Sequence, residues 1–404
     1  MNILVITYSR IPEGDAEALR LLTFGEILRD SGNEVYFVGM GFSNYMEEFE
    51  YRGFKYTSLR KNAKNKIQKI YYYLDYKRRL RQFLKSHILH KKIDGILVAD
   101  LPPFSINWLK KLCKTQNIHL LADSVEWYSS EQFKFGALSP SMILKNIENK
   151  YILDKNVKIV SISKYLQNYF VNKGCISVRI PVILDVKNLP YEKQINENKL
   201  TILYAGSPGK KDYVFEMLSG ILLLDEVERS RITFILAGVS YDDVNFFFSM
   251  DDLIKLNSCV EFLGRVERPV VLKKLAESDF TVLLRASNQR YARAGFPTKV
   301  VESLATATPV ILNLSSDLGD YINDMYEGLI VKDCSADEFA KTLKRALLLK
   351  KVQKEIMRQN ARLCAEKNFD YRLYMEQLSE LLIKDITLNN IELLVTDKGR
   401  EREW

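Results

Sequence analysis

The chain has 404 residues, of which 47% are hydrophobic and 27% are charged. This composition is typical of a folded globular protein and excludes a disordered chain, and the length favours two domains over one. No apolar run approaches the roughly 18 residues needed to cross a bilayer, and the opening MNILVITYS has the length of a strand, not of a signal peptide. The five cysteines are scattered without a CxxC pair, which predicts reduced thiols in the cytoplasm and no structural zinc site.

The net charge of +8 is unevenly distributed along the chain. Residues 1–190 contain 29 Lys and Arg against 18 Asp and Glu, which gives +11, and the remaining residues contain 30 against 33, which gives −3. Most of the excess lies in residues 61–92, where 11 basic residues accompany a single acid, Asp75. The pattern there predicts a helix with an apolar band beside a cationic face. Such a helix could lie on an anionic membrane surface or be a domain helix with a solvated basic side; nucleic-acid binding is not expected, because no known motif accompanies the charge.

Strand-like runs alternate with helical patterns from the first residues onward. In the first half the expected strands are NILVITY, EVYFVGM, DGILVAD, HLLADS and VKIVSIS, with a helical pattern at residues 16–31 after the first of them. In the second half they are LTILYAG, ITFILAG, CVEFLG, DFTVLLRA and TPVILN. Strand–helix alternation predicts an α/β protein with parallel sheets covered by helices on both faces.

The polar, strand-poor stretch at about residues 185–198 is the expected linker. We therefore expect an N-terminal domain over residues 1–190 and a C-terminal domain over residues 191–370. A last helical stretch, about residues 336–392, is long enough to cross between them, so that residues 371–404 return to the first domain and end in a frayed tail. Ligands of open α/β sheets bind beyond the carboxyl ends of the strands, so the chemistry is expected in a cleft between the two halves.

The segment YARAGFPTKVVESLATATPVI, residues 291–311, joins a loop to a predicted helix. Pro297 suits the first helical position because its missing N–H would be unpaired there, and Gly295 lets a ligand approach the backbone. The free N–H groups and the dipole of the helix start predict a phosphate site. Glu302 lies more than one turn into the helix, where its carboxylate could accept hydrogen bonds from a ribose diol; alternatively it is solvated and Gly-Pro only marks a helix start. Three basic residues lie within or beside the preceding loop: Arg285, Arg290 and Arg293.

A second phosphate signal follows the first strand of this half, in YAGSPGKKD. Gly206, Ser207 and Gly209 form a turn of small residues, and Lys210 and Lys211 come directly after it. Small residues at a strand end followed by lysine suit a diphosphate. Neither GxxxxGK[ST] nor GxGxxG is present, so a P-loop is excluded and a dinucleotide site is not indicated.

These turns, together with EFLGRV, VLKKLAESDF, GFPTKVVESLATATPVI and VRIPVILD, resemble the family 4 glycosyltransferases of the GT-B fold. The likeness covers nearly the whole chain and is most specific in the C-terminal half. The segment GFPTK resembles the corresponding motif in a subgroup of bacterial enzymes that build capsule and other surface polysaccharides. The resemblance implies two doubly wound, Rossmann-like domains facing across a cleft. It also implies a nucleotide-sugar donor of the UDP or GDP type in the second domain, an acceptor glycan or polyprenyl-linked oligosaccharide in the first, and retention of anomeric configuration.

The resemblance also assigns roles to residues of the second half. Glu302 corresponds to the glutamate that contacts the donor ribose. The turn whose amides meet the diphosphate and the sugar corresponds to Gly295, Phe296, Pro297 and Thr298. Lys210 or Lys211 corresponds to the basic residue that neutralises the diphosphate, with Lys211 also a candidate for catalysis. A third strand-end turn, Gly264, Arg265 and Val266, could meet the edge of the nucleobase.

Two positions depart from the family pattern. Ala294 stands where the motif usually places a glutamate eight residues before Glu302, and Ser207 stands where an arginine is common. The second departure suggests that Arg285 or Arg293 supplies the missing charge. Fixed N–H dipoles and lysines can meet the charge that develops on a leaving diphosphate, so we expect no metal and no other cofactor.

The first half offers fewer signals. Arg10, Gly14 and Arg20 lie in or just after the turn that follows the first strand, where the family usually approaches the acceptor and the donor phosphate. Asp123 and Glu126 follow a later strand in LLADSVEWYSS and could orient or deprotonate an acceptor hydroxyl. Many relatives have a histidine near this point, and Glu126 could instead cap a helix start.

Two other functions stay open. A GT-B-shaped subunit without catalysis could serve as partner to another transferase, which Ala294 motivates. A nucleotide-sugar epimerase would need clear acid–base residues. The acidic pairs Asp242–Asp243 and Asp251–Asp252 are interpreted as solvated surface residues.

Overall fold

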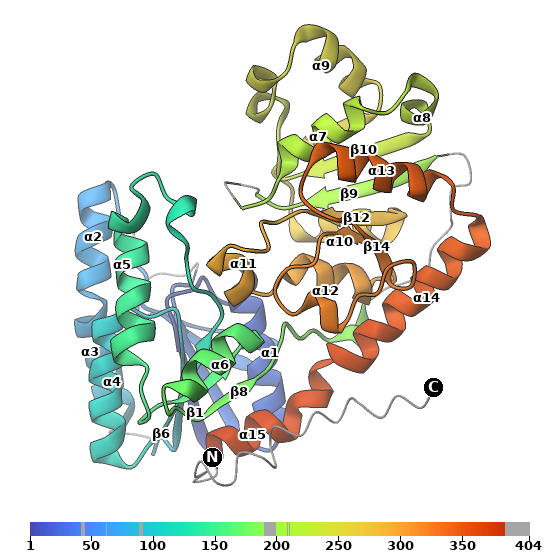
Figure 1. Ribbon diagram of the computed structural model, residues 1–404. Coiled ribbons are helices and arrows are strands. Elements are labelled where there is room, and N and C mark those ends of the chain that lie inside the picture. The colour runs from blue at the N-terminus through green and yellow to red at the C-terminus, as the bar shows by residue number, and fades with distance from the viewer. Residues whose placement is uncertain are drawn as a thin grey trace. The chain divides into compact units, whose positions relative to one another are not determined.

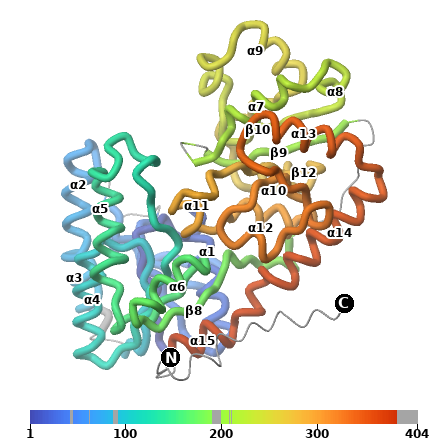
Figure 2. Tube along the Cα trace, in the orientation of Figure 1, coloured from blue at the N-terminus to red at the C-terminus, as the bar shows by residue number. Residues whose placement is uncertain are grey.

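A computed structural model describes the chain in two compact units (Figures 1 and 2). Unit 1 comprises residues 1–130, 137–183 and 371 onward, and unit 2 comprises residues 131–136 and 184–370. The described residues are 1–41, 45–61, 63–88, 92–189, 199–207, 209 and 211–383. Most of the expected linker, residues 190–198, lies outside them.

Unit 1 is built on a sheet of eight strands among the residues described. Their bounds are β1 Asn2–Thr7, β2 Glu34–Gly39, β3 Glu48–Tyr51, β4 Phe54–Ser58, β5 Gly95–Ala99, β6 His119–Ser124, β7 Lys158–Ser161 and β8 Ser177–Arg179. The spatial order is β3–β4–β2–β1–β5–β6–β7–β8, and all neighbours are parallel except β3 and β4. The chain therefore winds outward from β1 in one direction and then from β5 in the other, as in a doubly wound fold.

Helices cover this sheet because alternate residues of its central strands are apolar on both faces. In β1, Ile3 and Val5 join a core that includes residues of α1 and α15, and Leu4 and Ile6 are buried on the opposite face. The helices are α1 Ala16–Asp30, α2 Lys66–Leu74, α3 Tyr76–Ile88, α4 Pro103–Gln116, α5 Pro140–Ile147, α6 Lys164–Asn172 and α15 Met375–Ile383. None of the described helices of the chain is long and apolar enough to span a bilayer.

Unit 2 is built on a second, wholly parallel sheet in the order β11–β10–β9–β12–β13–β14. Tyr204 and Leu203, adjacent in β9, belong to separate apolar clusters on the two faces, as strand alternation requires. The strands are β9 Leu200–Ala205, β10 Ile232–Ala237, β11 Val260–Gly264, β12 Phe280–Leu283, β13 Val310–Leu312 and β14 Gly328–Ile330. The helices are α7 Val214–Leu222, α8 Glu226–Ser230, α9 Met250–Asn257, α10 Arg268–Glu277, α11 Arg290–Ala294, α12 Thr298–Ala305, α13 Ala336–Leu347 and α14 Lys351–Asn368. The predicted α/β class is confirmed.

Two helical stretches expected to be continuous are divided. The basic stretch splits at Asp75 into α2 and α3, and the stretch from residue 336 splits into α13, α14 and α15. The expectation of a single apolar band along the basic stretch is therefore wrong. Its later members, Tyr76, Leu80 and Leu84, are buried, whereas its earlier apolar residues lie on the surface.

Candidate functional site

Three glycines end three adjacent strands of unit 2. Gly206 follows β9, Gly238 follows β10, and Gly264 ends β11. A Cβ atom on Gly238 would lie 2.4 Å from the carbonyl oxygen of Gly206, and one on Gly206 would lie 2.3 Å from Nζ of Lys299. The amide of Gly238 donates to the carbonyl of Gly264 at 2.6 Å. The backbone can approach its neighbours this closely at Gly206 and Gly238 only because glycine has no side chain.

The sheet of unit 2 has its switch point between β9 and β12. The chain proceeds from β9 to β10 and β11 on one side and to β13 and β14 on the other side of β12. The carboxyl ends of such neighbouring strands border the crevice where open α/β sheets bind ligands. Residues that follow β9 and β12 therefore lie where a sheet of this kind binds its ligand.

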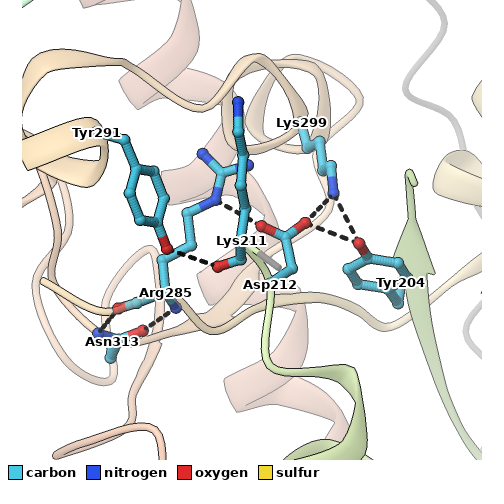
Figure 3. Close-up of polar contacts among 7 residues, drawn as sticks. All are labelled: Tyr204, Lys211, Asp212, Arg285, Tyr291, Lys299 and Asn313. Carbon is cyan, nitrogen blue, oxygen red and sulfur yellow. Dashed lines mark hydrogen bonds and ion pairs between the residues drawn. The ribbon is translucent and has the colours of Figure 1, made fainter. Parts of the chain in front are cut away.

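A polar network occupies this position (Figure 3). The carboxylate of Asp212 accepts a hydrogen bond from Nε of Arg285 at 2.7 Å through one oxygen. Its other oxygen accepts from Nζ of Lys299 and from the hydroxyl of Tyr204, each at 2.7 Å. The Asp212 side chain is 1% exposed, whereas those of Arg285 and Lys299 are 18% and 26% exposed. A buried carboxylate thus holds two partly exposed cations beside Gly206.

The charges in this network shift the pKa values of its members. Burial opposes ionisation of Asp212, but Lys299 and Arg285 outweigh it, so the pKa of Asp212 lies below its ordinary value. Desolvation of Lys299, with Arg285 close by, outweighs the attraction of Asp212 and lowers the pKa of Lys299. The three charges sum to +1, and the two cations also repel each other, so the group is suited to an anion that would relieve this repulsion.

Further hydrogen bonds fix the loops that carry these cations. The side chain of Asn313 pairs with the backbone of Arg285, accepting at 2.8 Å and donating at 2.7 Å. The hydroxyl of Tyr291 donates to the carbonyl of Lys211 at 2.8 Å. The two strand-end loops are thereby linked to one another, so the cations are held by rigid surroundings.

The turn before α12 differs in detail from the expected phosphate cradle. Pro297 precedes the helix, which begins at Thr298, one residue later than expected. The amide of Gly295 already donates to the carbonyl of Tyr291 at 3.0 Å. The ring of Phe296 is 6% exposed and packs among aromatic rings of unit 2. Gly295 and Phe296 therefore anchor the turn, and the amide of Thr298 lies at the helix start itself.

Glu302 is ion-paired, an interaction that the sequence did not predict. Its Oε1 accepts from Nη2 of Arg268 at 3.0 Å, and the side chain is 15% exposed. Arg268 is the first residue of α10, which follows the turn at Arg265 and Val266. In that turn Arg265 is exposed and Val266 is half-buried. The pair connects the predicted ribose-contacting residue with the turn predicted to meet the base.

The remaining predicted residues of the first turn are placed as follows. Ser207 is exposed and Lys211 is half-buried, and Lys210 lies outside the described residues. Sequence reasoning missed Tyr204, Asp212 and Lys299 as site residues. The signal for Lys299 was present in GFPTK, and Asp212 directly follows the two lysines.

In unit 1, Asp123 is bound to Arg20. Nε and Nη2 of Arg20 donate to the two oxygens of Asp123 at 2.8 and 3.1 Å, and the carboxylate is fully buried. Arg20 also donates to the carbonyls of Ile180, at 2.8 Å, and Pro181. Both oxygens of Asp123 are thus used to orient Arg20, which in turn joins α1 to the segment after β8, and this suits a positioning role.

Other predicted residues of unit 1 lie at the surface or near it. Glu126 is half-buried and accepts a hydrogen bond from the hydroxyl of Tyr128. Arg10 is exposed, and its carbonyl accepts from the amide of Gly14 at 2.7 Å. A Cβ atom on Gly14 would lie 2.4 Å from Cβ of Arg10, so this turn requires glycine.

Sequence reasoning missed two further carboxylates of unit 1, Glu17 and Asp100. Asp100 directly follows β5 and has a φ of 47°, which is unusual for a residue other than glycine. The residue as a whole is exposed, but protein atoms surround its carboxylate. This desolvation raises the pKa of Asp100 to about 7, although the charge of Lys145 acts to lower it. Burial and the nearby Asp100 raise the pKa of Glu17 as well. Among the described residues, no three His, Cys, Asp or Glu side chains gather in an arrangement that could hold a metal ion.

Comparison with known proteins identifies the domain that carries the network. Residues 185–363 match the model of the family described as glycosyl transferases group 1. The matched residues contain the whole of the site in unit 2, and the resemblance expected from its motifs is confirmed there.

Solved structures extend the likeness to the rest of the chain. Sucrose-phosphate synthase from Thermosynechococcus elongatus is 15% identical with a TM-score of 0.68, over 94% of this chain and 98% of that one. The glycosyltransferase WaaG is 14% identical with a TM-score of 0.67, over 94% and 99%. Anabaena HepE, solved with UDP, is 14% identical with a TM-score of 0.65, over 95% and 99%. These likenesses show the GT-B fold; no curated protein matches by sequence.

Proposed function

We propose that the protein is a retaining hexosyltransferase that moves a sugar from a nucleotide sugar to a glycan or lipid-linked oligosaccharide in bacterial surface polysaccharide synthesis. The observation that carries the proposal is the pair Arg285 and Lys299, held by buried Asp212 beside Gly206 at the switch point of unit 2. A diphosphate offers the charge and the size that such a pair of cations can bind. The match to the glycosyltransferase family supports the same donor class.

Two structural relatives support individual parts of the proposal. Anabaena HepE was solved with UDP-glucose, which favours a UDP-linked donor. WaaG takes part in lipopolysaccharide biosynthesis, which favours a surface glycan as product. The reduced cysteines and the use of nucleotide sugars favour a cytoplasmic location.

In the proposed reaction the residues of unit 2 meet charge on the leaving nucleoside diphosphate. Arg285, Lys299 and the amide of Thr298 stabilise the diphosphate without a metal ion, because they are already positioned when its charge develops. Lys210 or Lys211 adds a further positive charge. Oε2 of Glu302 accepts from the ribose while Oε1 stays on Arg268. The turn at Arg265 and Val266 receives the base.

The sugar is proposed to leave and be replaced on the same face. The acceptor hydroxyl attacks the anomeric carbon from the side of the departing diphosphate, and a donor phosphate oxygen takes its proton. This route needs no pair of carboxylates of the glycosidase kind. On the acceptor side, Glu126 orients the hydroxyl, Asp123 fixes Arg20, and Arg10 with Gly14 shapes the turn after β1.

A second function is favoured by one observation. Ala294 is fully buried where the family usually has a sugar-contacting glutamate. A GT-B subunit that binds a nucleotide but transfers nothing, and serves as partner to another transferase, would tolerate this change.

A donor panel tests the proposal. Binding of UDP-, GDP- and TDP-sugars is measured as the shift in melting temperature, since a ligand at 100 times its Kd stabilises by about 2.7 kcal/mol. Release of the nucleotide in the presence of acceptor glycans is measured in parallel. We expect one base class to bind and one sugar to be transferred. Binding without transfer to any acceptor would favour the partner subunit, and the absence of any shift would refute both.

A further inference from the structure

Helix α2 presents an apolar stripe to the outside of unit 1. The stripe consists of Ile67, Ile70, Tyr71 and Leu74, which are 78%, 62%, 55% and 59% exposed. Their spacing of three, one and three residues places them on one face of the helix. No residue of α2 is buried. Four adjacent apolar side chains in contact with water on a nine-residue helix are uncommon unless something covers them.

The helix is fixed to unit 1 by its other side. The ring of Tyr73 makes edge contacts with Tyr8 and Phe104, with centroids 5.4 and 6.1 Å apart. Asn65 caps its first turn by accepting from the amide of Gln68 at 2.8 Å. After its last turn, buried Arg79 donates to the carbonyls of Leu59 and Tyr72. The stripe is therefore held outward by the fold and is not a frayed segment.

The charged residues of the stretch that carries the stripe, residues 61–92, are almost entirely cationic. The only acid between residues 61 and 92 is Asp75, and it is paired with Arg78 at 2.7 Å and Arg79 at 3.4 Å. Exposed basic residues flank the stripe before, within and after α2: Lys64, Lys66, Lys69, Arg78 and Arg81. An apolar face rimmed by charges of one sign is complementary to a surface that is apolar inside and anionic at its edge.

We propose that α2 docks unit 1 on an anionic lipid surface, with the stripe in the acyl boundary and the lysines at the headgroups. Arg79, although cationic, has no part in this contact because it is fully buried. The apolar side of α3 also has none, because Tyr76, Leu80 and Leu84 lie in the core. The proposal does not depend on the proposed reaction, so either can fail alone.

A second exposed apolar patch provides a matched control. In unit 2, Phe246, Phe247, Met250 and Ile254 are 88%, 66%, 73% and 64% exposed. Their neighbours are the acidic pairs Asp242–Asp243 and Asp251–Asp252. An anionic surface would repel this patch, although its apolar exposure is as large.

Vesicle co-sedimentation of the full chain tests the proposal. The vesicles contain phosphatidylcholine alone or phosphatidylcholine with phosphatidylglycerol, at low and high salt. We expect binding only to the anionic vesicles, weakened by salt. The double variant Ile67→Ser/Leu74→Ser should bind roughly tenfold or more weakly, since two apolar side chains leave the interface. Lys66→Gln/Lys69→Gln should lose about fivefold for each lysine, and the control Met250→Ser/Ile254→Ser should bind like the wild type.

Several results would overturn the proposal. The wild type could stay in the supernatant with anionic vesicles at low salt, or the α2 and control variants could lose binding equally. Light scattering could instead show a dimer that Ile67→Ser/Leu74→Ser abolishes, which would make a second copy the occupant. Circular dichroism checks that each variant folds, which we expect because every replaced residue is exposed.

Discussion

Asp212 illustrates how one buried carboxylate can decide the geometry of a site. It is 1% exposed, yet it binds both cations that are proposed to meet the diphosphate. Replacing the buried carboxylate leaves Arg285 and Lys299 without their shared counter-ion. Because both cations are partly exposed, we expect a cost below the roughly 3–5 kcal/mol of a fully buried pair. Asp212 is therefore expected to support both stability and donor binding.

The pH dependence of Asp212→Asn follows from the direction of its pKa shift. The folded-state pKa of Asp212 lies below the ordinary value of 3.8. Its stabilisation is therefore complete above pH 3.8 and is lost as the pH falls through the folded value. We expect Asp212→Asn to lower the melting temperature at neutral pH and the difference from wild type to shrink in acid. The exposed Asp251→Asn is the control and should change little; an equal effect at every pH would contradict the charge-based role.

Glu302 is the second prediction at this scale. Glu302→Ala removes a charged acceptor from the proposed ribose contact, and hydrogen bonds to charged groups contribute about 1.5–3 kcal/mol. We expect the KM for the donor to rise roughly tenfold or more. Arg268→Ala is the comparison, since it breaks the same ion pair but leaves the carboxylate in place. A larger rise in KM for Arg268→Ala than for Glu302→Ala would show that the ion pair, not the ribose contact, is what matters.

At the scale of elements, two glycines at strand ends of unit 2 differ in how closely they are packed. Gly238 and Gly264 both have left-handed backbones, with φ of 94° and 59°. A Cβ atom on Gly238 would collide with the carbonyl of Gly206, whereas one on Gly264 would have no heavy atom within 4 Å. Adding a side chain would therefore strain the backbone at both positions, but it would cause a steric clash only at Gly238.

Alanine at each glycine tests this difference. Gly264→Ala bears only the cost of the left-handed backbone, about 1–2 kcal/mol. Gly238→Ala must also move β9 and β10 apart, so we expect a larger loss of stability and a loss of nucleotide-sugar binding. Urea unfolding and the donor-induced shift in melting temperature measure the two effects. Equal behaviour of the two variants would show that the contact with Gly206 is unimportant.

At the scale of the whole molecule, the chain completes unit 1 with its last described helix. Three leucines of α15 are fully buried and lie in the same core as residues of β1 and α1: Leu378, Leu381 and Leu382. Unit 1 is therefore built from both ends of the described chain, and unit 2 lies between them in sequence. Stability of unit 1 depends on residues that follow the whole of unit 2.

Truncation of one of these leucines tests that dependence. Leu382→Ala should cost about 2–5 kcal/mol, as expected for a fully buried leucine. Leu373→Ala, at a position that is 53% exposed, is the control and should change stability by less than about 0.5 kcal/mol. Urea denaturation gives both values. A small effect of Leu382→Ala would show that α15 is not needed by unit 1.

The sequence alone predicted the parts that depend on local pattern. Continuous apolar runs such as ITFILAG became buried parallel strands, since only a sheet covered on both faces buries such a run. Gly206, Glu302 and the turn before α12 could be proposed as site residues because glycine, proline and an isolated carboxylate are conspicuous in a short window. The acidic pairs were also interpreted correctly: Asp243 and Asp252 accept from Ser240 and Ser249 at exposed helix starts.

The tertiary structure decided what depends on distant residues. Asp212 meets Lys299, 87 residues later, and Glu302 meets Arg268, 34 residues earlier, and no local spacing specifies either ion pair. The same holds for the basic stretch, where one pattern yielded an apolar side that is exposed in α2 and buried in α3. Periodicity shows that a helix has an apolar face, but only the packing of the whole chain determines whether that face meets the core or the outside, because burial is a property of the neighbours and not of the helix.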